Sequence, residues 1–145
     1  MAQRILWLDN DPAYLGTYEE ALLENGFEVK LVTNVTSAER LLETETYDLL
    51  ILDVMIPTKT EAEENFYPPE ATDFGLKTGL LFYCRMKPKL DQNMTPVLVM
   101  TVRLDSAILD AFVKAGLKQD NFCTKMSLRE RPIFIGKVKE ILGKK

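Results

Sequence analysis

The stretch Asp48-Leu49-Leu50-Ile51-Leu52 is the most hydrophobic strand candidate in the chain, and it runs directly into Asp53. An uninterrupted apolar run is typical of a strand buried on both faces of a parallel sheet. Open α/β sheets bind their ligands beyond the carboxyl ends of such strands. Asp53 therefore stands where a functional residue is expected.

Similar apolar runs alternate with amphipathic segments along the rest of the chain, which is the pattern of βαβ units. Strands are predicted at 4–8, 27–32, 48–52, 96–100 and 121–124. Helices are predicted at 12–25, 36–44, 79–86 and 105–115, and from 129 or 132 to 142. The alternation predicts an α/β fold with a doubly wound, five-stranded parallel sheet. We expect one domain over residues 1–145, without an output domain.

Composition and charge exclude several classes of function. The 145 residues contain 18 Lys plus Arg and 22 Asp plus Glu, so the net charge of −4 offers no basic excess for binding nucleic acid. No apolar run approaches the roughly eighteen residues of a membrane-spanning helix, and no signal peptide precedes the first strand. Cys84 and Cys123 indicate reduced thiols in a cytoplasmic protein. Histidine is absent, which excludes His-based triads and metal sites.

Polar residues follow four of the five predicted strands. They are Asp9, Asn10 and Asp11 after the first strand, Asp53 after the third, Thr101 after the fourth and Lys125 after the fifth. Carboxylates that converge at one edge repel one another, and Mg²⁺ with oxygen ligands relieves that repulsion. A carboxylate at such a site can attack a phosphoryl group whose charge a lysine and a hydroxyl stabilise. The set predicts acyl-phosphate formation on Asp53.

The sequence resembles the receiver domain of two-component response regulators (CheY-like) over essentially its whole length. Five segments carry the resemblance in the family's order and spacing: 5–12, 49–57, 96–101, 115–116 and 122–125. The resemblance implies strand order 2-1-3-4-5. It also implies that a sensor histidine kinase or a phosphotransfer protein phosphorylates Asp53 in a Mg²⁺-dependent reaction.

The resemblance assigns further roles. The implied metal ligands are Asp9, Asn10, Asp53 and the backbone carbonyl of Met55. Thr101 and Lys125 would contact the phosphoryl group, and Thr101 and Phe122 would form the switch that changes a protein-interaction surface. A downstream protein target is implied, with a monomer or weak homodimer and no membrane or nucleic-acid partner. The implied chemistry is at most self-phosphorylation and self-dephosphorylation, so the protein is not expected to be an enzyme.

Three positions depart from the family pattern. Asn10 replaces the usual second acid, so the metal site loses a charge, and we expect weaker Mg²⁺ binding and slower phosphorylation. Met126 replaces a typical cis proline, and because a cis peptide before a non-proline residue costs about 2.5–4 kcal/mol, a trans turn is expected. Val102 is bulkier than the usual residue and is expected to restrict access to the phosphoryl group.

The segment 58–78 is the largest departure. If Gly79 opens the third helix, this connection is roughly eighteen residues longer than the family's, long enough to suggest a function. Its part 58–72 is acidic, contains Pro68-Pro69 and shows no sustained periodicity, so we predict an irregular loop there. The inserted loop 58–78 is expected to act as a lid or a docking segment.

Two alternatives remain open from the sequence. Asn10 and Met126 suggest a degenerate receiver that signals without phosphate. The Asp-x-Asp spacing suggests a phosphohydrolase in which Asp9 is the nucleophile and Asp11 the general acid, although Pro12 follows where that class has further motif residues.

Overall fold

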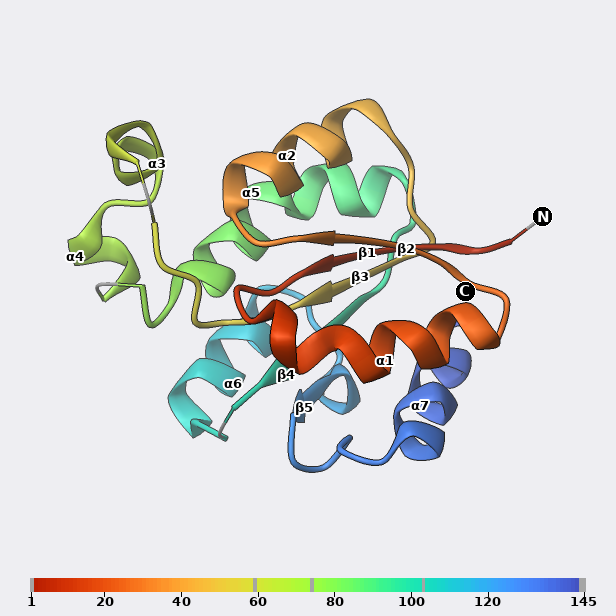
Figure 1. Ribbon diagram of the computed structural model, residues 1–145. Coiled ribbons are helices and arrows are strands. Elements are labelled where there is room, and N and C mark those ends of the chain that lie inside the picture. The colour runs from red at the N-terminus through yellow and green to blue at the C-terminus, as the bar shows by residue number, and fades with distance from the viewer. Residues whose placement is uncertain (1, 59, 74, 103, 144–145) are drawn as a thin grey trace.

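The computed structural model in Figure 1 describes residues 2–58, 60–73, 75–102 and 104–143. Five parallel strands form one sheet in the order β2-β1-β3-β4-β5. They are β1 (Arg4–Leu8), β2 (Glu28–Val32), β3 (Leu49–Leu52), β4 (Val97–Thr101) and β5 (Phe122–Thr124). The predicted fold class and strand order are confirmed.

Helices cover both faces of the sheet. They are α1 (Pro12–Glu24), α2 (Val35–Thr44), α3 (Glu61–Phe66), α4 (Pro69–Thr72), α5 (Thr78–Gln92), α6 (Ser106–Lys114) and α7 (Arg131–Gly143), with a 3₁₀ turn, η1, at Gln119–Asn121. One core forms between the sheet and α2, α5 and α6, and a second between the sheet and α1 and α7. In Figure 1, α2 and α5 lie above the sheet and α1 and α7 below it.

The two cores share the central strand. Leu50 and Leu52 of β3 point into the first core, and Leu49 and Ile51 point into the second. All four side chains are fully buried, as the continuous apolar run predicts for a strand covered on both faces. This burial fixes the position of Asp53 one residue past the end of β3. Among the described residues, no helix is long and apolar enough to cross a membrane.

Helix α5 is longer than predicted. We expected it to end before Pro88, but it continues to Gln92 with Pro88 inside it. Phe82, Met86 and Leu90 recur at intervals of four residues, and all three are buried. The free energy gained by burying these side chains outweighs the cost of the backbone hydrogen bond that Pro88 cannot donate.

The prediction of an irregular loop over residues 58–72 is wrong, because the segment forms α3 and α4. Thr60 caps α3, its hydroxyl accepting a hydrogen bond from the Glu63 amide at 3.1 Å. Pro69 occupies the first turn of α4, where the absence of an N–H costs nothing. The prolines that suggested an irregular loop therefore start a helix. With these helices, the described residues contain seven α-helices and not the predicted five.

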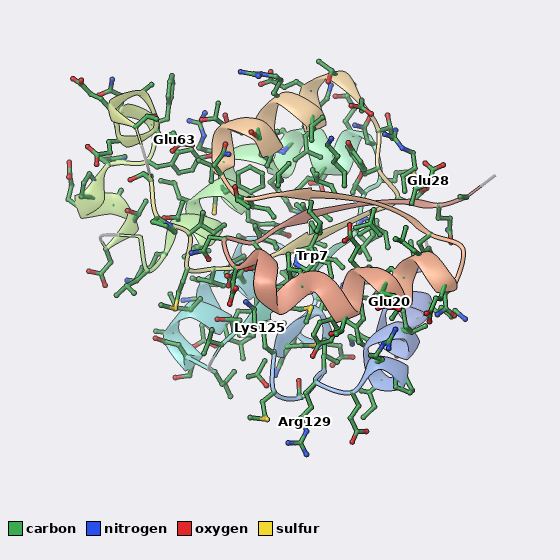
Figure 2. The ribbon with its side chains drawn as sticks, in the orientation of Figure 1. Trp7, Glu20, Glu28, Glu63, Lys125 and Arg129 are labelled. Atoms are coloured by element: carbon green, nitrogen blue, oxygen red, sulfur yellow. The ribbon has the colours of Figure 1, made fainter. Side chains whose placement is uncertain are left out.

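A buried glutamate attaches this inserted segment to the rest of the fold. Glu63 is only 5% exposed, and one of its carboxylate oxygens accepts hydrogen bonds from the Thr36 hydroxyl at 2.9 Å and the Thr36 amide at 3.4 Å. Thr36 lies in the first turn of α2, where amides lack partners within the helix. Figure 2 shows Glu63 between α3 and α2.

Tyr67 provides a second attachment. Its side chain is 2% exposed in the first core, and its hydroxyl donates a hydrogen bond to Glu39 of α2. The same Glu39 oxygen pairs with Arg85 of α5 at 3.0 Å. The Arg85 guanidinium also stacks over the rings of Phe66 and Tyr67, at 5.1 and 5.2 Å from their centres. The insertion is therefore packed onto both helices, beyond the strand ends seen at the left of Figure 1.

The insertion rejoins the fold directly against the residue that carries the candidate site. The Gly79 amide donates to the Val54 carbonyl at 2.8 Å, and the Ile56 amide donates to the Gly75 carbonyl at 3.1 Å. A Cβ atom at Gly79 would lie 2.1 Å from the Asp53 carbonyl oxygen and 2.7 Å from the Val54 Cα. Only glycine permits this close approach of two backbones.

Candidate functional site

Four polar residues predicted from the strand ends come together at the carboxyl edge of the sheet. Asp9 follows β1, Asp53 follows β3, Thr101 ends β4 and Lys125 follows β5. All four are buried, with exposures of 0%, 3%, 4% and 9% in that order. Charged groups rarely become so buried without a partner, so their surroundings decide what this cluster can do.

The sheet's own hydrogen bonds place the two aspartates side by side. The Asp53 amide donates to the Leu8 carbonyl at 2.9 Å, which extends the β1–β3 pairing by one residue and sets Asp53 beside Asp9. The Lys125 amide donates to the Thr101 carbonyl at 2.7 Å and extends the β4–β5 pairing in the same way. The positions of these residues therefore follow from strand register.

Lys125 joins the two carboxylates. Its Nζ lies 2.9 Å from Asp9 Oδ2 and 3.5 Å from Asp53 Oδ2. One ammonium group thus neutralises two buried carboxylates only in part. The three side chains therefore meet at one edge of the sheet, where their positions after the strands led us to expect them.

Asp53 occupies an environment that disfavours its charge. Its Oδ1 accepts a hydrogen bond from the Val54 amide at 2.8 Å. Burial, and secondarily repulsion from Asp9, raise the pKa of Asp53 to about 6, against the opposing effects of Lys125 and the amides of Val54 and Met55. The carboxylate is therefore ionised at neutral pH, yet it is more basic than an exposed aspartate. A group of this kind is suited to act as a nucleophile.

The residues that follow β1 do not share one environment. Asp9 is buried, and its Oδ1 accepts a hydrogen bond from the Asp11 amide at 3.0 Å. Asn10 and Asp11 are exposed. Asp9 therefore belongs to the central cluster, whereas the Asn10 side chain forms no hydrogen bond with the described part of the chain.

The donor atoms fit a hard divalent cation. Asp9 Oδ2 is buried and accepts no hydrogen bond from the described residues, being held by its ion pair with Lys125 alone. With Asp53 it supplies two carboxylates, and Mg²⁺ characteristically binds one or two carboxylates while keeping several waters. Within the described ranges, no group of three His, Cys, Asp or Glu side chains forms an all-protein metal cage. The two carboxylates present are of the kind that Mg²⁺ binds while it keeps several of its waters.

The two residues predicted to form a switch line the same cavity. Thr101 and Phe122 both face a cavity of about 150 Å³ that also reaches Val54 and Met55, the residues after Asp53. Phe122 is 8% exposed and packs against Phe112 of α6, with ring centres 5.6 Å apart. Space therefore exists between the end of β3 and α6, next to both Thr101 and Phe122.

The departures after β4 and β5 lie at the rim of the site. No cis peptide occurs among the described residues, so the Lys125–Met126 bond is trans, as expected without proline. Val102 and Met126 are 62% and 66% exposed, and both line an open groove of about 390 Å³ beside Lys125. Restriction of access by Val102 stays a prediction.

Sequence reasoning missed one residue near this site. Lys77 lines the 150 Å³ cavity with Thr101, although it lies far from every motif in the sequence. The inserted segment carries it there, and no spacing rule for strand ends predicts where such an insertion returns. Asp105 also lines this cavity. It is the N-cap of α6, and its Oδ1 accepts hydrogen bonds from the Ala107 amide at 2.9 Å and the Ile108 amide at 3.2 Å.

Comparison with solved structures identifies the fold. A CheY-like response regulator receiver domain protein from Methanospirillum hungatei JF-1 matches with a TM-score of 0.73 and 17% identity, over 99% of this chain and 96% of that chain. A response regulator from Thermotoga maritima matches with a TM-score of 0.68 and 20% identity, over 99% of both chains. The signal receiver domain of a signal transduction histidine kinase from Syntrophus aciditrophicus matches with a TM-score of 0.70 and 22% identity, over 98% of this chain and 91% of that chain.

No model of a known protein family matches the sequence. The structural matches nevertheless cover nearly the whole chain and include its sheet order, so the protein has the CheY-like receiver fold.

Proposed function

We propose that this protein is a phosphoacceptor receiver domain of a two-component phosphorelay. Asp53 would take a phosphoryl group from a sensor histidine kinase or a phosphotransfer protein and so change a surface that a downstream protein recognises. The observation that carries the proposal is the contact of Lys125 with both Asp9 and Asp53 at the strand ends. Two of the similar structures are named as receiver domains, which supports the same role.

The proposed reaction is a displacement at phosphorus. An ionised Asp53 oxygen attacks the phosphorus of a phosphohistidine, a P–O bond to Asp53 forms, and the P–N bond to the imidazole breaks. The departing imidazole takes a proton from solvent and leaves as a neutral ring. The raised pKa of Asp53 favours this step, because a more basic carboxylate is a better nucleophile once it is ionised.

Lys125 and Thr101 stabilise the charge that the reaction moves. The Lys125 ammonium already lies between the two carboxylates and is in reach of a phosphoryl group attached to Asp53. The Thr101 hydroxyl, at the end of the neighbouring strand, can donate a hydrogen bond to a phosphoryl oxygen. Fixed donors of this type act strongly in a buried site because they need not reorganise during the reaction.

Mg²⁺ would be held by Asp9, Asp53 and the Met55 carbonyl, with the Asn10 amide oxygen in place of a second acid. When bound, it supplies positive charge that offsets repulsion between the carboxylates and the phosphoryl oxygens. Because Asn10 carries no charge, we expect weaker Mg²⁺ binding than in a site with three carboxylates, and a slower reaction.

The switch follows from the cavity shared by Thr101 and Phe122. A phosphoryl group on Asp53 would draw the Thr101 hydroxyl toward it, and Phe122 would occupy the space that is released. The surface formed by α6, β5 and α7 would then change, because Phe122 lies in β5 and packs on Phe112 of α6. A two-state element of this kind converts a local charge into a distant surface change.

The phosphohydrolase alternative gains no support from the site. Its two acids do not share one environment, since Asp9 lies in the buried cluster and Asp11 is exposed outside it. A nucleophile and a general acid must reach the same phosphoryl group from opposite sides. The degenerate-receiver alternative is decided by the following experiment.

The test is phosphorylation by acetyl phosphate or phosphoramidate with Mg²⁺, followed by intact mass measurement. We expect the mass of one phosphoryl group to be gained by the wild type and by Asp91→Asn, an exposed acid on α5 that serves as control. We expect no gain in Asp53→Asn. Reduction with borohydride should mark residue 53 alone.

Two results would contradict the proposal. An adduct that persists in Asp53→Asn would place the acceptor elsewhere. An unmodified wild type under conditions where a known receiver reacts fully would favour signalling without phosphate. Steady release of product from a phosphate ester, abolished by Asp9→Asn, would instead favour the phosphohydrolase.

A further inference from the structure

The inserted segment and the end of β4 with the start of α6 line one cavity beside the candidate site. The insertion contributes Asp73, Leu76 and Lys77, and Thr101, Asp105 and Ile108 also line the cavity. Val54 and Met55 lie next to Asp53 in sequence and reach the same cavity. A molecule that approaches Asp53 from this side therefore passes the end of the insertion.

Lys77 is the only basic side chain among the described residues that line this cavity. Its backbone is fixed at the start of α5, since its amide donates to the Thr72 carbonyl at 2.7 Å and its carbonyl accepts from the Leu80 and Leu81 amides. No carboxylate of the described residues lies within 4.0 Å of its Nζ, whereas Lys87 and Lys125 are both paired. Lys77 thus combines a fixed backbone with an ammonium group that pairs with no carboxylate of the described residues.

The charges of the site show what this ammonium group could bind. Asp9 and Asp53 carry two negative charges against the single positive charge of Lys125. Two carboxylates, Asp73 and Asp105, line the cavity with Lys77, so the described lining is itself net negative. An anionic phosphodonor therefore approaches a site whose buried cluster is net negative, and a cation at its entrance lowers that repulsion.

We propose that Lys77 is a phosphodonor-binding residue, which contacts the non-bridging oxygens of the phosphoryl group as the donor enters the cavity. This inference rests on the proposed function and adds a residue that the insertion supplies. Because Lys77 is exposed, its contribution is modest and sensitive to salt.

The test measures the apparent second-order rate constant of phosphorylation for the wild type, Lys77→Ala, Lys77→Arg and the control Lys114→Ala, an exposed lysine on α6. With acetyl phosphate, we expect Lys77→Ala to be about fivefold slower, the size typical of an exposed charge pair. Lys77→Arg and Lys114→Ala should stay within about twofold of the wild type.

Two further measurements separate charge from packing. Phosphoramidate carries less negative charge than acetyl phosphate, so Lys77→Ala should slow its reaction less. The difference between Lys77→Ala and the wild type should shrink as ionic strength rises, because salt screens exposed charges. Equal rate constants for Lys77→Ala and the wild type would overturn the inference and leave the proposed function intact. A loss that Lys77→Arg does not restore would also overturn it. If neither phosphodonor modified the wild type, both the proposed function and the inference about Lys77 would be contradicted.

Discussion

Two buried carboxylates, Asp53 and Glu63, lie in opposite environments within one small protein. Asp53 is 3% exposed and shares the ammonium group of Lys125 with a second carboxylate, Asp9. Glu63 is 5% exposed and accepts hydrogen bonds from the amide and hydroxyl of Thr36 at the start of α2. The first is short of positive charge. The second faces the positive end of a helix dipole.

The comparison separates a carboxylate whose charge its surroundings disfavour from a carboxylate whose hydrogen bonds hold two helices together. Placing Asp53 in its site costs free energy, as its raised pKa records, because burial and Asp9 both oppose its charge. Glu63 has no competing carboxylate among its printed contacts, and its hydrogen bonds satisfy donors at the start of α2 that lack partners within the helix. Burial alone therefore does not separate a candidate functional carboxylate from a structural one.

The largest change in stability is expected at Gly79, where the inserted segment meets the end of β3. Gly79→Ala would bring a Cβ to 2.1 Å from the Asp53 carbonyl oxygen, so the start of α5 must move away from β3. We expect the free energy of unfolding to fall by about 3 kcal/mol, the upper range for overpacking. Urea denaturation followed by the fluorescence of Trp7, which is buried and stacked 5.4 Å from Phe134, measures this loss.

Gly16→Ala is the matched control for Gly79→Ala. Gly16 lies in α1, and an added Cβ would meet no atom within 4 Å. Since alanine favours a helix over glycine by about 1 kcal/mol, Gly16→Ala should leave stability unchanged or raise it. A Gly79→Ala protein as stable as the wild type would show that the insertion is not held tightly against Asp53.

The second-largest change is expected for Asp53→Asn, which should raise the free energy of unfolding where Gly79→Ala lowers it. Asp53→Asn removes a charge that folding disfavours, and the Asp9–Lys125 pair at 2.9 Å remains. A pKa of about 6 means that the folded state binds the Asp53 proton more tightly than the unfolded state does. Stability from this group is therefore fully present below about pH 4 and is lost as pH rises through about 6. We expect Asp53→Asn to raise the free energy of unfolding at pH 7.5 by about 2 kcal/mol.

This gain should disappear near pH 4, where wild-type Asp53 is protonated. Urea denaturation of both proteins in EDTA at several pH values between 4 and 8 measures the difference. Asp110→Asn, at an exposed position on α6, should show no such gain at any pH. If Asp53→Asn were less stable than the wild type at pH 7.5, the central carboxylate would be a stabilising residue and the contrast with Glu63 would fail.

Loss of the Glu63 side chain should reduce stability at neutral pH. Glu63→Ala leaves the Thr36 amide and hydroxyl without their acceptor and detaches α3 from α2. We expect the free energy of unfolding to fall by about 1.5 kcal/mol, as for hydrogen bonds to a charged group. Limited proteolysis should also cut the inserted segment 58–78 faster in Glu63→Ala than in the wild type. Glu64→Ala, the exposed neighbour on α3, is the control and should change neither measurement.

The sequence predicted the positions of the strand-end residues far better than the structure of the inserted segment 58–78. Asp9 and Asp53 follow apolar runs typical of buried strands, and Lys125 follows the short strand β5, so strand register brings the three residues together. The attachment of Glu63 and Tyr67 depends on a tertiary fit to α2 and α5 that no local pattern records. Pro68 and Pro69 favoured an irregular loop, because a proline that starts a helix and a proline that breaks one look alike in sequence.

The smallest expected effect tests whether the two carboxylates act independently. Asp53 and Glu63 share no hydrogen-bond or ion-pair partner among the described contacts: Asp53 depends on Lys125, and Glu63 on Thr36. Sites without shared partners usually contribute additively, so the double variant Asp53→Asn/Glu63→Ala should match the sum of the single changes within about 0.5 kcal/mol at pH 7.5. A coupling energy well above that value would mean that the docked insertion and the acceptor site form one cooperative unit. Phosphorylation of Asp53 would then weaken or strengthen the contact between α3 and α2. The insertion would in that case take part in the proposed conformational switch of Thr101 and Phe122.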